Sequence, residues 1–186
     1  MFKQPLIKMT VLFATLYGST SVLAADFRDA SWGMSLRDVL ALHPGELPAD
    51  RKIGYLAYEG KLARLDMKIF YRFDSDGLLY QAGYLFKTDG REDVVLDDYE
   101  RLNELLRKRY PNAEAYEKNW SNDLFTAKPR EWARAVRIGH LEFDWQHEAS
   151  GLLITHSLRG SRREISHVLE YEASSDHSIG DALEQL

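Results

Sequence analysis

Histidines are the side chains of this sequence best suited to acid–base or metal chemistry, and two of the six fall in a pattern. His147 and His156 are predicted to share one face of a β-hairpin with Phe143, Trp145 and Ile154. A zinc site needs at least three protein ligands, and this face offers two imidazoles among apolar side chains. Neutral histidines in the core or at its rim are the favoured interpretation, and a metal pair is the alternative.

Two acidic clusters have spacings that suit a cation. His140, Glu142 and Asp144 recur at every second residue, so in a strand all three point to one side. With 29 acidic residues in the chain, a solvated strand face is the favoured explanation. The run 74–77 has the composition of part of a calcium loop, but with Gly77 sixth the first and twelfth places fall on Arg72 and Gly83. A hairpin tip explains that run better.

Arginines around a Gly-Ser turn form the one candidate anion site: Arg159, Arg162 and Arg163. A charged turn is the simpler interpretation. The sequence has no nucleophile elbow, phosphate loop or dinucleotide fingerprint, and the absence of cysteine excludes thiolate chemistry and zinc–thiolate sites. We therefore expect no catalysis, no cofactor and no bound metal.

The elements that would position these residues are organised around the stretch 63–87. Apolar residues alternate with polar ones up to Phe73, and alternation resumes after the Asp-Gly pair that ends at Gly77. The apolar face of this predicted hairpin consists of Leu65, Met67, Ile69, Tyr71, Phe73, Leu78, Tyr80, Ala82, Tyr84 and Phe86. Such a face must be covered by other parts of the chain.

The opposite face of this hairpin carries a second set of apolar side chains. Phe70, Leu79 and Leu85 are predicted to lie there, beside Tyr55 or Tyr58. Together they would form a surface patch that binds a partner protein. The alternative is that the C-terminal tail or residues 112–136 cover them.

Two helices are expected to cover the sheet. Ser35 can cap a short helix with Asp38 three residues on, and a longer helix is predicted over 92–109. Residues 112–136 read ambiguously as a strand followed by a short helix or another strand. Alternation predicts strands over 141–147, 152–158 and 165–171. The expected fold is α+β, with helices packed on one face of an antiparallel sheet.

The predicted organisation has four parts: a signal peptide at 1–24, a helix-plus-hairpin half at 25–90, a helix-plus-strands half at 91–173, and a frayed tail at 174–186. The halves repeat an order of elements, which suggests a tandem duplication; a single α+β domain is the alternative. The first residues carry Lys3 and Lys8, a short apolar run and small residues up to Ala24, as a cleavable secretory signal does. We expect a periplasmic protein that does not span the membrane.

Part of the sequence resembles a known family. Residues 31–87 are similar to the opening of SmpA/OmlA-type outer-membrane assembly lipoproteins, and the doubled layout resembles the tandem-repeat β-lactamase inhibitor proteins. The motif consists of Gly33-Met34-Ser35, Asp38-Val39, Leu42, Gly45 and Pro48. The lipid-anchor cysteine and the disulfides of these families are absent. The resemblance implies an envelope protein that binds another protein through its sheet or loops.

Three functions therefore compete. The first is a non-enzymatic envelope protein that binds another protein as an inhibitor, an immunity-type protein or an assembly factor. Its formal charge of −5 suits a basic partner and disfavours nucleic acid. The second is a small-ligand- or metal-binding periplasmic protein, and the third, less favoured, is a hydrolase.

Overall fold

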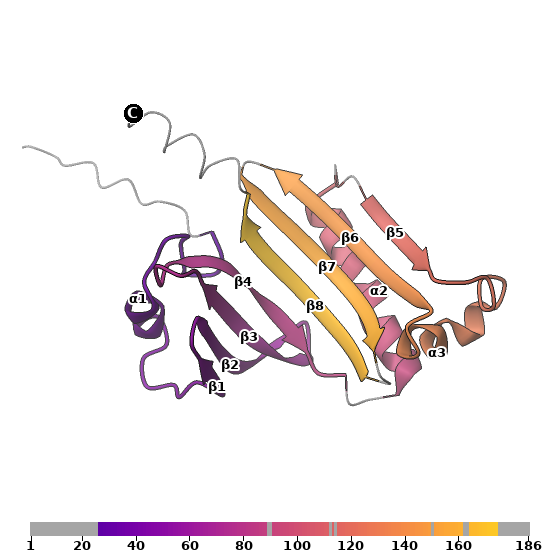
Figure 1. The fold of residues 1–186 in the computed structure, drawn as a ribbon, viewed down its shortest axis with the longest axis horizontal. Coiled ribbons are helices and arrows are strands. Elements are labelled where there is room, and N and C mark those ends of the chain that lie inside the picture. The colour runs from indigo at the N-terminus through magenta and orange to yellow at the C-terminus, as the bar shows by residue number, and fades with distance from the viewer. Residues whose placement is uncertain are drawn as a thin grey trace, which may run out of the picture.

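A single antiparallel sheet of eight strands runs through the whole computed structural model (Figure 1). The structure describes residues 26–88, 91–111, 113, 115–149, 151–161 and 164–174. In chain order the elements are α1 (Leu36–Ala41), β1 (Asp50–Lys52), β2 (Tyr55–Leu62), β3 (Leu65–Phe73), β4 (Leu79–Phe86), α2 (Glu92–Arg109), β5 (Ala115–Trp120), the 3-10 turn η1 (Pro129–Glu131), α3 (Trp132–Arg137), β6 (Leu141–Ala149), β7 (Leu152–Ser161) and β8 (Glu164–Ala173).

The strand order is β1-β2-β3-β4-β8-β7-β6-β5, so the last strand of each half lies at the centre. The antiparallel sheet is confirmed, and strand rather than helix makes up most of the fold. In the part of the chain described, no helix is long and apolar enough to cross a membrane. The predicted signal peptide lies outside the described residues, as does the tail after residue 174.

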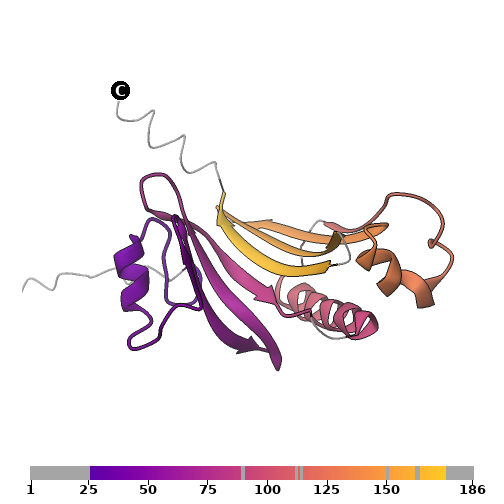
Figure 2. The same cartoon turned by 60° about the horizontal axis from the view of Figure 1, so that its bottom comes forward.

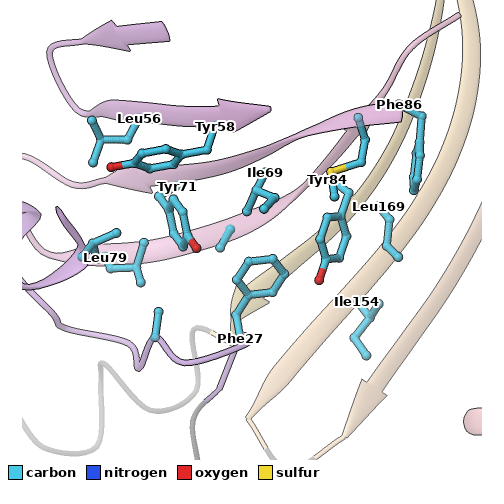
Figure 3. Packing of buried hydrophobic residues seen from close by; sticks show 14 of the residues in the cluster. Phe27, Leu56, Tyr58, Ile69, Tyr71, Leu79, Tyr84, Phe86, Ile154 and Leu169 are labelled. Carbon is cyan, nitrogen blue, oxygen red and sulfur yellow. The ribbon is translucent and has the colours of Figure 1, made fainter. Parts of the chain in front are cut away.

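One face of the sheet, here called the inner face, holds the core. Cross-strand pairing lines up Tyr58, Ile69, Tyr84, Leu169, His156 and Trp145 in one row across six strands. Met67 and Tyr71, which the sequence placed on the covered face, are 1% and 2% exposed. Figure 3 shows the ring of Phe27 lying over this face, beside Tyr84 and opposite Ile154.

The helices lie against the inner face. Figure 2 shows α1 beside β1–β4 and α2 beneath β5–β8. Helix α1 begins at the predicted capping box, in which the hydroxyl oxygen of Ser35 accepts from the backbone N–H of Asp38, 3.3 Å away. Helix α2 has the predicted bounds and buries the apolar side chains Val95, Tyr99, Leu102 and Leu106.

The tip of the β3–β4 hairpin is the predicted turn. A side-chain oxygen of Asp74 accepts from the backbone N–H groups of Asp76 and Leu78, both at 2.9 Å. Gly77 has φ +79°, a conformation that glycine adopts without strain. The run 74–77 therefore acts as a hairpin tip, as the sequence indicated.

A β-bulge beside this turn makes one sequence expectation wrong. Arg72 pairs with Gln81, but the next residue, Phe73, pairs with Leu79. The extra residue on β4 reverses the alternation, so Leu79 is buried on the inner face while Leu78 and Tyr80 are 41% and 37% exposed. The sequence had predicted the reverse, with Leu78 and Tyr80 on the covered face and Leu79 on the opposite face.

Two further turns were not predicted. Residues 53–54 form a turn that separates β1 from β2. Ala63 and Arg64, expected to begin a strand, form a turn with φ of +50° and +71°. Of the alternatives for residues 112–136, the structure forms a strand, β5, followed by a short helix, α3.

Candidate functional site

The face of the sheet opposite the core is here called the open face, and its residues alternate with the buried ones. One row across it joins Tyr55, Arg72, Gln81 and Glu172, and the next joins Phe70, Gly83 and Glu170. The centre of the open face, where β4 pairs with β8, is therefore polar and charged.

A connected polar network occupies this centre. Nη1 of Arg72 donates to Oε1 of Gln81 at 2.6 Å, and Nε2 of Gln81 donates to Oε2 of Glu172 at 3.1 Å. Nη1 of Arg72 also lies 3.5 Å from a carboxylate oxygen of Glu170. Three strands thus hold one guanidinium between an amide and a carboxylate. We call Arg72, Gln81, Glu170 and Glu172 the Arg72 network.

The Arg72 network lies against an aromatic pair. The guanidinium carbon of Arg72 is 5.1 Å from the centre of the Phe70 ring, and the Tyr55 ring stacks on Phe70 at 6.2 Å. Phe70 lies over Gly83, where an added Cβ would come within 2.8 Å of the Phe70 ring and 2.3 Å of a backbone oxygen of Leu169. Glycine at position 83 therefore allows this close packing.

Electrostatics makes Glu170 unusual for a residue on an open sheet face. Burial raises the pKa of Glu170, while Arg72 lowers it by a smaller amount and Glu172 raises it further. The carboxylate has therefore already lost part of its hydration. Desolvated charges of this kind contribute more to binding than charges at a solvated rim.

The predicted partner patch is only partly formed. Tyr58 and Leu79 belong to the inner-face core and are each 2% exposed, and Phe70 on the open face is 3% exposed. Tyr58 instead stacks on His43 at 3.9 Å. Tyr55 and Leu85 remain accessible on the open face, and Leu85 is 36% exposed. The five residues do not form one exposed surface.

The candidate anion site is occupied by internal ion pairs. Arg159 contacts Asp144 at 2.6 Å and Glu142 at 3.7 Å. Arg162 and Arg163 lie outside the described residues. Glu142 and Asp144, two of the three residues of the possible cation cluster, are therefore paired with Arg159. The third, His140, lies beside Phe125 at 5.7 Å.

The histidines on the inner face are arranged differently from the predicted pair. His147 and His156 do share a face, but His147 lies against Tyr110 at 4.8 Å. His156 instead contacts His167, with their Nε2 atoms 2.9 Å apart. No group of three or more metal-binding side chains occurs within the described ranges.

A groove of about 1130 Å³ opens at the end of the sheet where β4 and β8 separate. Three of its basic side chains are paired with acidic ones: Lys87 with Glu59 at 3.1 Å, Arg159 with Asp144 at 2.6 Å, and Arg137 with Glu92. The groove is lined by Lys68, Leu85, Lys87, Arg137, Arg159 and Ser161, among others. Much of the positive charge in the groove is therefore paired within the chain.

The Arg72 network could not be predicted from the sequence because its members come from three separate strands. Arg72 and Gln81 appear in the sequence as ordinary polar positions of alternating strands, and the partner of β4 was not assigned. The two-residue spacing of Glu170 and Glu172 was the one local signal, and it is typical of any solvated strand. Comparison of the chain with protein families, with curated proteins and with solved structures gave no match.

Proposed function

We propose that this chain is an exported periplasmic protein that binds another protein through the open face of its sheet, without transforming it. The observation that carries the proposal is the Arg72 network beside Tyr55, which is preassembled by hydrogen bonds at the centre of the sheet. Arginine and tyrosine are over-represented among residues that dominate binding energy. Side chains already fixed by neighbours lose little entropy on binding.

Charge points to a basic partner. On β5–β8, the described basic side chain of the open face is Arg159, and acidic ones outnumber it. These are Glu117, Glu142, Asp144, Glu148, Glu164, Glu170 and Glu172. A lysine or arginine of the partner, placed between Glu170 and Glu172, would restore interactions that Glu170 lost on burial. Complementary charge would also speed association.

We further propose that the fold is a two-layer α+β arrangement built by tandem duplication of a helix-plus-strands unit. Each half runs from a helix through four strands, and the halves meet where β4 pairs antiparallel with β8. This arrangement supports the resemblance to the doubled layout of the β-lactamase inhibitor proteins. The duplication would place the binding surface across the junction of the halves.

The test is charge reversal on the open face. The mature chain, residues 25–186, is used as bait for chemical crosslinking in an envelope extract, as wild type and as the E170K/E172K variant. We expect one stoichiometric partner with wild type and at least tenfold less with the variant. The control is Glu104→Lys on the exposed side of α2, which changes charge away from the open face.

The proposal fails if the double variant captures the partner as well as wild type does, or if no stoichiometric partner is found. Circular dichroism of each variant shows that lost capture does not reflect lost folding. A small-ligand-binding periplasmic protein is the second candidate, favoured by the groove of about 1130 Å³. Native mass spectrometry of the purified mature chain would then show a bound small molecule or metal in place of a protein.

A further inference from the structure

His156 on β7 and His167 on β8 form a hydrogen-bonded pair inside the core. Their Nε2 atoms lie 2.9 Å apart, and the two residues are 0% and 1% exposed. In an N–H···N hydrogen bond one nitrogen carries the hydrogen and the other offers a lone pair. The pair therefore cannot carry hydrogen on both Nε2 atoms, and full protonation of both rings would break the contact.

The described groups that pack against the pair are aromatic rings and carry no negative charge, so a protonated imidazole would gain cation–π attraction but no ion pair. Helix α2 sets Tyr99 against the pair, with its ring 4.2 Å from His156 and 5.6 Å from His167. Strand β4 contributes Phe86, 4.4 Å from His167, and β6 places Trp145 beside His156. Burial raises the pKa of Tyr99, so this phenol stays neutral. Within the described ranges, no carboxylate is hydrogen-bonded to either ring.

Tyr99 links the histidines to α2. Its hydroxyl donates to the backbone oxygen of His156 at 3.2 Å, and its ring stacks on the imidazole. Nδ1 of His156 has no hydrogen-bond partner in the part of the chain described. A ring that gains a proton would thus carry an unpaired charge directly under the helix, where desolvation strongly opposes it.

We propose that the His156–His167 pair is an acid-sensitive latch, and that proton uptake by the two rings releases α2 from β7 and β8. Such a latch responds in the pH range where free histidines titrate. An opened state would expose the rings to water, where they accept protons. The folded state would have to bury the charge.

The direction and size of the response follow from linkage. Burial lowers the pKa of His167 to about 3, and burial together with His167 lowers the pKa of His156. Histidines in an opened chain titrate near pH ~6.5, so above that pH both states are neutral and the latch has full strength. As the pH falls below ~6.5, each ring multiplies the opening constant about tenfold per pH unit. For two rings we expect an increase of about 1000-fold between pH 8 and pH 5.

The experiment compares proton uptake on unfolding between wild type and the H156Q/H167Q variant. Urea unfolding of the mature chain is measured at intervals from pH 8 to pH 5, and the slope of the unfolding constant gives the protons bound. At pH 5 we expect about two fewer protons for the variant than for wild type. His147→Gln, a half-buried histidine on β6, is the matched control and should leave the inner-pair contribution intact.

Hydrogen exchange separates a latch from a merely stabilising pair. After correction for intrinsic rates, α2 amides should gain more exchange between pH 8 and pH 5 than β3 amides do, and the double variant should lose this difference. Equal responses of α2 and β3, or an unchanged slope in the double variant, would overturn the proposal. If the double variant does not fold, NMR of wild type decides. Two imidazoles must remain neutral at pH 5, and titration of either near pH 6.5 would refute the latch.

Discussion

Phe27 is a core side chain that lies outside the helices and strands and contacts three strands. Its ring lies 5.9 Å from Tyr71 on β3 and 5.2 Å from both Tyr84 on β4 and Tyr171 on β8. Phe27 is 3% exposed. It lies in no helix or strand, and its backbone forms only an isolated β-bridge with Ala30. A residue before the first helix therefore adds aromatic contacts on both sides of the β4–β8 junction.

Removing this ring should be costly. We expect Phe27→Ala to lower the free energy of unfolding by about 3–5 kcal/mol, because it leaves a cavity shared by three strands. Urea denaturation of the mature chain measures the loss. Leu47→Ala is the control, since Leu47 is 91% exposed and should change stability by less than ~0.5 kcal/mol. A loss below ~1 kcal/mol for Phe27→Ala would show that the core closes over the gap.

Individual side chains also show where sequence periodicity fails. Phe27 lies outside every alternating or helical segment, so nothing local marked it as a core residue. Leu79 alternated correctly with its neighbours, but the bulge after Arg72 moved it to the inner face. Both outcomes depend on tertiary packing, which a pattern within one strand does not contain.

Close packing of α3 onto β7 depends on Gly160. A Cβ added there would lie 1.8 Å from the backbone oxygen of Val136 and 2.9 Å from the carbonyl carbon of Arg137. The neighbouring groups are backbone, so they cannot move aside as a flexible side chain would. This contact fixes the end of a short helix against the sheet.

Gly160→Ala should therefore displace α3. We expect a loss of unfolding free energy of about 1–3 kcal/mol or more, because backbone atoms must separate to admit the methyl group. Thermal or urea unfolding measures it, with the exposed neighbour Ser161→Ala as the control. If both variants retained wild-type stability, the contact between α3 and β7 would be looser than described.

Helices and long strands were the elements that sequence predicted best. The spacing of apolar residues gave α2 its bounds, and β6, β7 and β8 followed from alternation of Leu141, Ile154 and Leu169 with polar neighbours. The turn at Ala63–Arg64 was missed because neither residue is a usual φ > 0 residue.

Buried phenols make the molecule sensitive to alkali. Burial raises the pKa of Tyr71 to about 12, and burial also raises the pKa of Tyr84 and Tyr171. Near pH ~10 and above, the unfolded chain loses phenolic protons that the folded chain keeps, so stability falls as the pH rises. These three groups should ionise only together with unfolding.

Absorbance at the phenolate band tests this expectation. We expect the buried phenols Tyr71, Tyr84 and Tyr171 to ionise abruptly at a pH well above ~10, together with loss of circular dichroism. In denaturant, which exposes every phenol, the curve should become a single transition near pH ~10. A single transition in the native protein as well would contradict the burial of these rings.

The order in which the strands pair in the sheet could not be predicted from the sequence. Alternation identified most strands, but nothing in it indicated that Gln81 and Tyr84 would pair with Glu172 and Leu169. That pairing brings together residues about ninety positions apart, and it creates the Arg72 network. The candidate site is therefore a product of topology, which explains why single residues in one strand gave no sign of it.

The central place of β8 has a consequence for how the chain reaches its final state. Residues 164–173 are the last strand described, yet they lie between β4 and β7. A chain that emerges from its amino end can form the β1–β4 meander early, but one side of β4 then waits unpaired until the carboxyl-terminal strand arrives. Completion of the sheet therefore waits for β8, and deleting β8 would open the middle of the sheet rather than an edge.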